Sequence, residues 1–248
     1  MAFKDIKYKE PLIPHQKYEN RLVAFIDILG FSEMVNHTIV DAKNIRCLTA
    51  ALKSLYDKFW QWEADGTYSS FAFTQFSDSI VISSLAETTD SFEMLQQLLL
   101  GVVELVDSYG ILVRGGIACG ALIHDKVMVV GPAMNEAYYL ESKIAKYPRI
   151  IIAKELKEQI EVDLAESLLS RTQLTSVPQY CKLFQIDEDG YCYLDYVNPD
   201  EIYCERTKEE HLMILEQLVQ KNLQSTLDQR VKEKYCWLQK KIKGAKII

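Results

Sequence analysis

Residues 22–32 read LVAFIDILGFS and predict a buried strand, an acid at its end and a tight turn into a helix. The first five residues are apolar and rich in strand formers. Asp27 then places a carboxylate where the strand meets a loop, and Gly30 lets the backbone approach another group closely. We expect the helix to follow directly, with Ser32 as its N-terminal cap and Glu33 in its first turn.

Two interpretations of Asp27 fit this stretch. A carboxylate beside free backbone N–H groups at the start of a helix suits a metal-bound phosphate. Alternatively, Asp27 is itself a helix cap near the end of a strand. The stretch alone leaves both interpretations open.

A second stretch, FAFTQFSDSIVISS at residues 71–84, predicts a hairpin with Ser77 and Asp78 at its tip. A lone acid in a hairpin tip is most often a turn residue. Asp78 has apolar runs on both sides, however, so it should lie at the edge of a core. Two acids at the ends of adjacent core strands are the minimum that can hold two divalent ions on a triphosphate.

Composition narrows the class of protein. The chain has 248 residues, a hydrophobic content of 48% and a formal net charge of −7. These values predict one large domain, or one domain with an appendage, and disfavour nonspecific binding to nucleic acid or a membrane surface. The N-terminus is charged and carries prolines, no apolar run reaches the length of a membrane span, and the cysteines form no CxxC pair. We therefore expect a cytoplasmic protein with reduced thiols.

The remaining patterns predict an α+β fold, an α/β sandwich with a ferredoxin-like βαββαβ core. Helical spacing covers residues 41–63, 91–108 and 134–147, strands are expected at 111–119 and 121–130, joined near Gly120, and a short strand at 150–153. Beyond Lys154, we expect a hairpin formed by residues 180–186 and 191–196. Residues 209–242 predict one long helix or a broken pair, packed on its own core or on a partner subunit.

Four segments occur in an order that resembles the class III nucleotidyl cyclases: FIDILGFS, FSDSIVIS, VRGGIACG and VGPAMNEAYYLE. The resemblance covers residues 21–153, more than half of the chain. It implies a cyclase-like catalytic domain at residues 21–200. The charged start of the chain predicts an N-terminal arm at 1–20, and the helical periodicity near the other end predicts a C-terminal helical extension at 201–248. Each motif alone is weak, but four in order at compatible spacings are fairly specific.

The resemblance assigns roles to individual residues. Asp27 and Asp78 match the ligands of two Mg²⁺ or Mn²⁺ ions, which activate the ribose 3′-hydroxyl and hold the triphosphate. The phosphate oxygens would lie against the backbone of four residues, Ile28, Leu29, Gly30 and Phe31. Asn135 matches the asparagine that orients the ribose; the alternative is an ordinary residue near the start of a helix.

Three positions depart from the family pattern. Tyr139 stands where the family has an arginine that stabilises the transferring phosphate, and a tyrosine hydroxyl carries no charge. The sequence does not show which of the nearby cations, Arg114 among them, compensates. Thr74 and Met128 occupy the base-recognition positions, and together they lack the charged pair that would read a purine.

These departures make the chain similar to the bacterial pyrimidine cyclases of anti-phage signalling, the Pycsar-type enzymes. The similarity implies synthesis of cyclic UMP or cyclic CMP, with UTP slightly favoured over CTP as the substrate. It also implies a homodimer with composite active sites and a separate effector that the cyclic nucleotide activates. Two alternatives remain: an adenylate or guanylate cyclase with an atypical base pocket, and an inactive module that binds a nucleotide.

Overall fold

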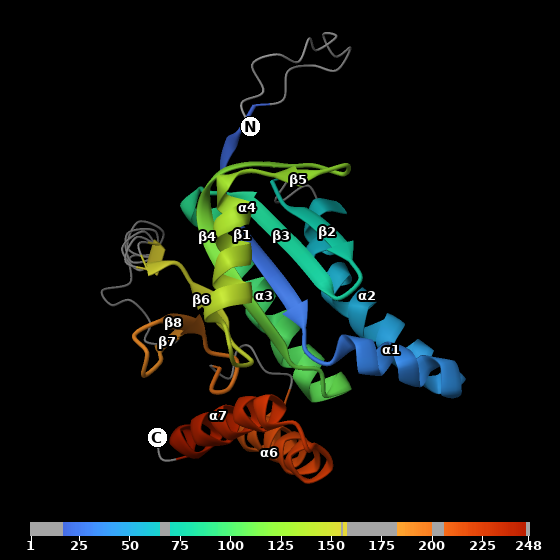
Figure 1. Cartoon of the computed structure of the whole chain (residues 1–248). Helices are drawn as coiled ribbons and strands as arrows, with labels where there is room; N and C mark the ends of the chain where they lie inside the picture. The colour runs from blue at the N-terminus through green and yellow to red at the C-terminus, as the bar shows by residue number, and fades with distance from the viewer. Residues whose placement is uncertain (1–16, 65–69, 155, 158–182, 200–205, 247–248) are drawn as a thin grey trace, which may run out of the picture.

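The computed structural model describes residues 17–64, 70–154, 156–157, 183–199 and 206–246 (Figure 1). Its main feature is a single mixed sheet with the strand order β2-β3-β1-β4-β6-β8-β7. The strands are β1 (Glu19–Ile28), β2 (Ala72–Phe76), β3 (Ser79–Leu85), β4 (Val113–His124), β6 (Ile150–Ile152), β7 (Phe184–Ile186) and β8 (Cys192–Leu194). A short strand, β5 (Val129–Val130), pairs with the end of β4.

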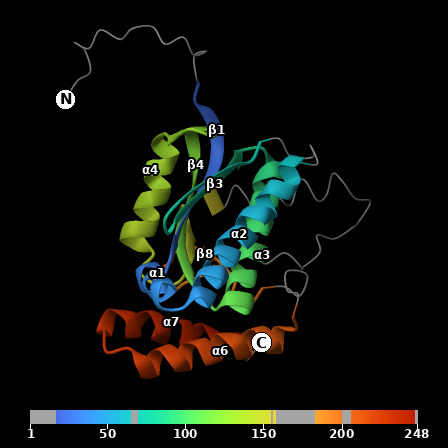
Figure 2. The same cartoon turned by 90° about the vertical axis from the view of Figure 1, so that its right-hand side faces the viewer.

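The helices cover both faces of this sheet. They are α1 (Phe31–Val40), α2 (Ala42–Ala64), α3 (Thr88–Tyr109), α4 (Pro132–Tyr139), α6 (Lys208–Ser225) and α7 (Gln229–Ala245). Figure 2 shows α4 on one side of the sheet and α2 with α3 on the other. No helix in the described ranges is both long and apolar enough to cross a membrane.

The alternation of side chains in β1 explains this arrangement. Leu22, Ala24 and Ile26 belong to the main core with α2 and α3, whereas Val23 and Phe25 pack with Ala133 and Ala137 of α4. A strand with apolar residues at successive positions is buried on both faces. β1 pairs antiparallel with β3 and with β4. The predicted α+β class and βαββαβ order are therefore confirmed.

The predicted break near Gly120 is wrong. β4 runs without interruption from Val113 to His124, and Gly120 pairs with Arg21 in the continuous register between β1 and β4. Gly120 has a φ angle of +152°, which a glycine adopts without steric cost. The glycine therefore lets a long strand continue where the sequence pattern predicts a junction.

Two helix boundaries also differ from the prediction. The first helix begins at Phe31 after Gly30, which has a φ of +77°, so Ser32 is not its cap. The predicted helix at residues 134–147 is instead α4 followed by a π-helical turn, Leu140–Ile144, in which the Ala145 N–H donates to the Leu140 carbonyl over 2.8 Å. Pro132 suits the first turn of α4 because proline needs no N–H partner there.

The C-terminal region forms the hairpin of β7 and β8 and then the helix pair α6 and α7, the broken form of the expected helix. Both helices lie together at one end of the sheet (Figure 1). Leu215 of α6 and Leu238 of α7 are fully buried in the main core. His211 of α6 lies 2.6 Å from Asp107 of α3 through Nδ1, which joins α6 to the sheet-covering helices.

Candidate functional site

Two acids meet where β1 and the β2–β3 hairpin end. Asp27 is the penultimate residue of β1, and the N–H of the next residue, Ile28, donates to the carbonyl of Asp78 over 3.1 Å. Burial raises the pKa of the Asp27 carboxyl, Arg114 opposes this effect, and the charge of Asp78 pushes the pKa upward again. The fold thus brings the two predicted metal ligands into electrostatic contact.

Arg114 stands between Asp27 and a third acid. It is the register partner of Asp27 on β4, and its Nε donates to Asp27 Oδ2 over 3.0 Å. The same nitrogen lies 2.7 Å from Oε1 of Glu141, whose side chain is 3% exposed. Burial raises the pKa of Glu141, and Arg114 opposes that rise. The sequence alone could not place Arg114 in the site and did not single out Glu141.

A second cation reaches this edge from the C-terminal helix α7. Burial and the charge of Arg114 lower the pKa of Lys234, whereas Asp27 and Glu141 raise it. Lys234 therefore shares the electrostatic environment of the two acids, although Asp27 lies near the start of the sequence and Lys234 near its end, so that no sequence pattern links them.

The donor set fits a magnesium or manganese ion. Within the described ranges, no group of three or more His, Cys, Asp or Glu side chains is arranged to hold a metal on its own. Mg²⁺ in phosphate-transfer sites is usually bound by one or two carboxylates together with substrate phosphates. Asp27 and Asp78 provide such a pair, and a divalent cation would offset the burial that disfavours ionised Asp27.

The backbone after Asp27 offers fewer phosphate-binding groups than the sequence predicts. The N–H of Ile28 donates to Asp78, and the N–H of Leu29 donates to the Leu112 carbonyl over 2.9 Å. Helix α1 begins at Phe31 with Gly30 before it, and the first N–H groups of a helix have no partner within the helix. The predicted phosphate cradle therefore narrows from four residues to Gly30 and Phe31.

The predicted base-recognition residues lie near the end of β4. Thr74 Oγ1 is 3.0 Å from Nε2 of His124, and the other ring nitrogen, Nδ1, is 2.8 Å from Ser83 Oγ. The turn after His124 carries Met128, which is 42% exposed. His124 is 50 positions from Thr74, so only the folded chain reveals this contact.

His124 is neutral at physiological pH. Its side chain is buried, and that burial lowers its pKa from 6.5 to about 4. The charge of Arg21 lowers the pKa further, whereas Asp125 opposes the shift. A neutral imidazole has one donor and one acceptor nitrogen, so its two neighbours cannot both receive a proton from it.

We expect this histidine to destabilise the fold in mild acid. Because the folded pKa lies below 6.5, the unfolded state binds the proton first, and stability is lost as the pH falls from 6.5 towards 4. Between pH 7 and pH 5, the free energy of unfolding should fall by about 2 kcal/mol from this group. Urea unfolding at both pH values, compared with a His124→Gln variant, measures the effect; equal losses in the two proteins would contradict it.

Asn135 and Tyr139 lie one helical turn apart on α4, and both are exposed. The Tyr139 side chain is 54% exposed. Among the described residues, no hydrogen bond or ion pair joins either side chain to Asp27 or Asp78. A single chain therefore presents these two side chains to its surroundings and does not join them to the acids.

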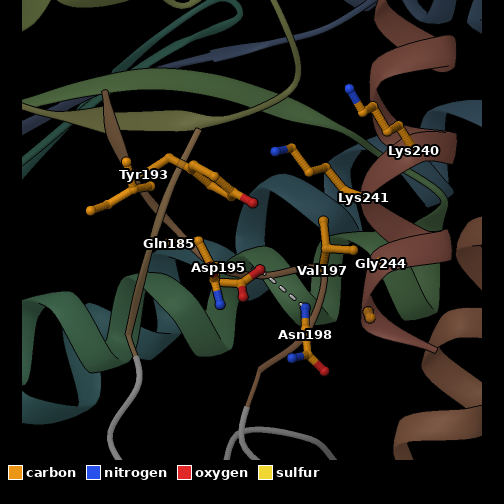
Figure 3. Close-up of a pocket in the computed structure, with 10 residues that line it drawn as sticks. Gln185, Tyr193, Asp195, Val197, Asn198, Lys240, Lys241 and Gly244 are labelled. Atoms are coloured by element: carbon orange, nitrogen blue, oxygen red, sulfur yellow. Dashed lines mark hydrogen bonds between the residues drawn. The ribbon is translucent and has the colours of Figure 1, made fainter. Parts of the chain in front are cut away.

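Among the cavities that the described residues line, two lie beside the C-terminal helices. Figure 3 shows one of about 270 Å³ between the β7–β8 hairpin and α7, where the Asn198 N–H donates to the buried Asp195 over 3.1 Å. Another, of about 480 Å³, opens beside Leu29 and Gly30 and is bordered by α6 and α7. Neither lining includes Asp27 or Asp78, so the two acids belong to neither cavity.

No protein-family model and no curated protein matches this sequence. Several solved structures do match it. The adenylyl cyclase CyaB from P. aeruginosa is 16% identical, with 59% of this chain and 82% of that chain covered and a TM-score of 0.46. An adenylate cyclase structure from Trypanosoma brucei is also 16% identical, with 77% and 92% covered and a TM-score of 0.45. At these values, the activity of this chain has to be argued from its own residues.

Proposed function

We propose that this protein is a class III nucleotidyl cyclase that converts a pyrimidine nucleoside triphosphate to its 3′,5′-cyclic monophosphate and pyrophosphate. The observation that carries the proposal is the meeting of Asp27 and Asp78 beside the start of helix α1. A pair of carboxylates next to helical N–H groups suits a triphosphate bound through divalent cations.

The described residues divide the chemistry between them. Asp27 and Asp78 would hold two Mg²⁺ or Mn²⁺ ions, which lower the pKa of the ribose 3′-hydroxyl and neutralise the leaving pyrophosphate. The N–H groups of Gly30 and Phe31 would bind phosphate oxygens. Arg114 orients the Asp27 carboxylate through its 3.0 Å hydrogen bond.

The site retains positively charged side chains although Tyr139 stands at the arginine position of the family. Tyr139 can donate one hydrogen bond but carries no charge. Arg114 and Lys234 both interact electrostatically with Asp27, and they supply positive charge near the phosphates. Lys234 is the better candidate for a direct phosphate contact because Arg114 is already paired with acids.

The substrate proposal rests on Thr74 and Met128. The charged pair by which the purine cyclases read their base is absent at these positions, and a threonine hydroxyl can donate to or accept from a pyrimidine. We therefore propose UTP or CTP as the substrate, with UTP slightly favoured. An adenylate or guanylate cyclase with an unusual pocket is the competing assignment.

We further propose a homodimer in which one subunit supplies the acids and its partner supplies Asn135 and Tyr139. Both residues are exposed on α4, as a contribution to a neighbouring subunit requires. Several large apolar side chains are also exposed on α4, the β4–β5 turn, β5 and the end of β2: Phe76, Val127, Met128, Val130, Tyr138 and Tyr139. Exposed apolar groups of this kind are typical of protein interfaces.

The similarity to Pycsar-type enzymes extends the proposal to a biological role. The protein would act in the cytoplasm as a second-messenger synthase in anti-phage defence. Its cyclic nucleotide would activate a separate effector protein. This part of the proposal rests on the sequence motifs and the altered base positions alone.

Product analysis tests the proposed function. Purified protein is incubated with Mn²⁺ and each of ATP, GTP, CTP and UTP, beside an Asp78→Ala control, and the products are identified by mass. We expect a cyclic pyrimidine monophosphate that is absent from the control. A cyclic purine product would overturn the substrate assignment. Stabilisation by a triphosphate without any turnover would instead indicate a nucleotide-binding module.

A further inference from the structure

Four polar side chains on the α4 side of the sheet form one hydrogen-bonded series, which we call the polar relay: Arg21, Ser83, His124 and Thr74. Arg21 Nε donates to Ser83 Oγ over 3.0 Å. Ser83 Oγ then lies 2.8 Å from one nitrogen of His124, and the other nitrogen lies 3.0 Å from Thr74 Oγ1. The first three members are buried, with Ser83 fully so.

The direction of the relay follows from its first member. A guanidinium has donors only, so Ser83 Oγ must accept from Arg21. The Ser83 hydroxyl still has its own proton to donate. Among the described residues, the one acceptor within hydrogen-bond distance of this hydroxyl is Nδ1 of His124. Donation to Nδ1 is therefore favoured, because a buried donor left without an acceptor is costly.

This direction fixes the state of the remaining groups. Since His124 is neutral and Nδ1 accepts, its single proton is on Nε2. Nε2 then donates to Thr74 Oγ1, so the threonine hydroxyl has its own proton left for another acceptor. Thr74 is thus presented as a donor, although an isolated threonine could act in either sense.

We propose that the polar relay fixes Thr74 as a hydrogen-bond donor and thereby selects uracil over cytosine. Uracil has a carbonyl oxygen at position 4, which accepts a hydrogen bond, whereas cytosine has an amino group there, which would oppose one donor with another. The inference rests on the proposed function in that Thr74 faces position 4 of the base, since the O2 carbonyl is common to uracil and cytosine. It gives the slight preference for UTP a physical cause.

The chain offers a matched pair of variants to test the relay. Ser83→Ala removes the donor to His124, so Thr74 becomes free to accept. Ser84→Ala makes the same change at the next residue, which is also fully buried but whose hydroxyl has no hydrogen-bond partner among the described residues. Thr74→Val removes the proposed contact with the base altogether.

Two measurements are made on each protein. The ratio of kcat/KM for UTP to that for CTP should be roughly 30 in the wild type and in Ser84→Ala, and below about 3 in Ser83→Ala and Thr74→Val. Nitrogen-15 NMR of the histidine side chains at pH 7.5 should show His124 with its proton on Nε2 in the wild type. A purely structural effect of Ser83→Ala would lower both kcat/KM values together and leave their ratio unchanged.

The outcomes separate this inference from the proposed function. A proton on Nδ1, or an unchanged ratio in Ser83→Ala, overturns the relay even if the protein is a cyclase. If no nucleotide is turned over, the same ratio is taken from dissociation constants of 3′-deoxy-UTP and 3′-deoxy-CTP, which lack the attacking hydroxyl. A preference for the uridine compound that Ser83→Ala removes would then support the relay while the cyclase proposal fails. Binding of neither compound overturns both.

Discussion

Replacing Asp27 with asparagine is expected to lower cyclic nucleotide formation by about 10³-fold while the protein stays folded. Asparagine has nearly the same shape but lacks the negative charge that a divalent cation requires. Burial already disfavours the ionised form of Asp27, since its pKa is raised. Losing that charge weakens the contact with Arg114 but removes a desolvation cost, so stability should change by only about 1 kcal/mol.

The measurement is the initial rate with the preferred triphosphate and Mn²⁺, together with the unfolding free energy in urea. Asp41→Asn is the matched control, because Asp41 is an exposed acid after helix α1 and should leave the rate unchanged. A rate for Asp27→Asn within tenfold of the wild type would argue against the metal assignment.

A mixing experiment extends this result to the composite site. Asp27→Asn chains and Asn135→Ala chains should each be inactive, because one lacks the acid and the other lacks the ribose contact. In a heterodimer, one of the two sites would carry neither change. Mixed chains should therefore regain about a quarter of the wild-type activity if half of all dimers are mixed and each has one intact site. No recovery, with heterodimers shown separately, would contradict a shared site.

Replacing Gly116 with alanine is expected to destabilise the protein by about 3 kcal/mol. A methyl group at this position of β4 would lie 2.2 Å from the carbonyl oxygen of Ala137 and 2.6 Å from Cβ of Leu140. Both neighbours belong to the segment formed by α4 and the π-helical turn, which rests directly on the strand. A backbone atom cannot move aside as the end of a flexible side chain can. Helix α4 must therefore move away from the sheet to make room for the methyl group.

Urea unfolding measures this effect, and Gly244→Ala provides the control. Gly244 lies in helix α7 and has nothing within 4 Å of the added methyl group. Its replacement should therefore raise the unfolding free energy by about 1 kcal/mol through helix propensity. A loss below about 1 kcal/mol for Gly116→Ala would mean that α4 does not pack as closely as the structure shows.

The sequence predicts those parts of the fold that depend on local patterns. Apolar runs and turn residues are sufficient for β1, the β2–β3 hairpin and the end of α3, where Gly110 adopts a left-handed conformation. The continuity of β4 through Gly120 is not visible locally, because a glycine between two apolar runs looks the same in a turn and in a strand. Only pairing with β1 distinguishes the two.

The residues of the candidate site also fall into those predicted from local patterns and those placed by long-range contacts. Asp27 and Asp78 follow from motifs at strand ends, which are local features. Arg114, Lys234 and His124 depend instead on strand register, on the docking of α7 and on the contacts between the end of β4 and the β2–β3 hairpin. These are properties of long-range contacts, and a single sequence contains no spacing from which they can be read.

The position of α6 and α7 has a consequence for how the protein is made. These helices bury Leu215 and Leu238 against the main core, yet they are the last described elements of the chain. During synthesis, the sheet and its other helices leave the ribosome while this apolar end is still uncovered. Completion of the core therefore has to wait until α6 and α7 have themselves left the ribosome.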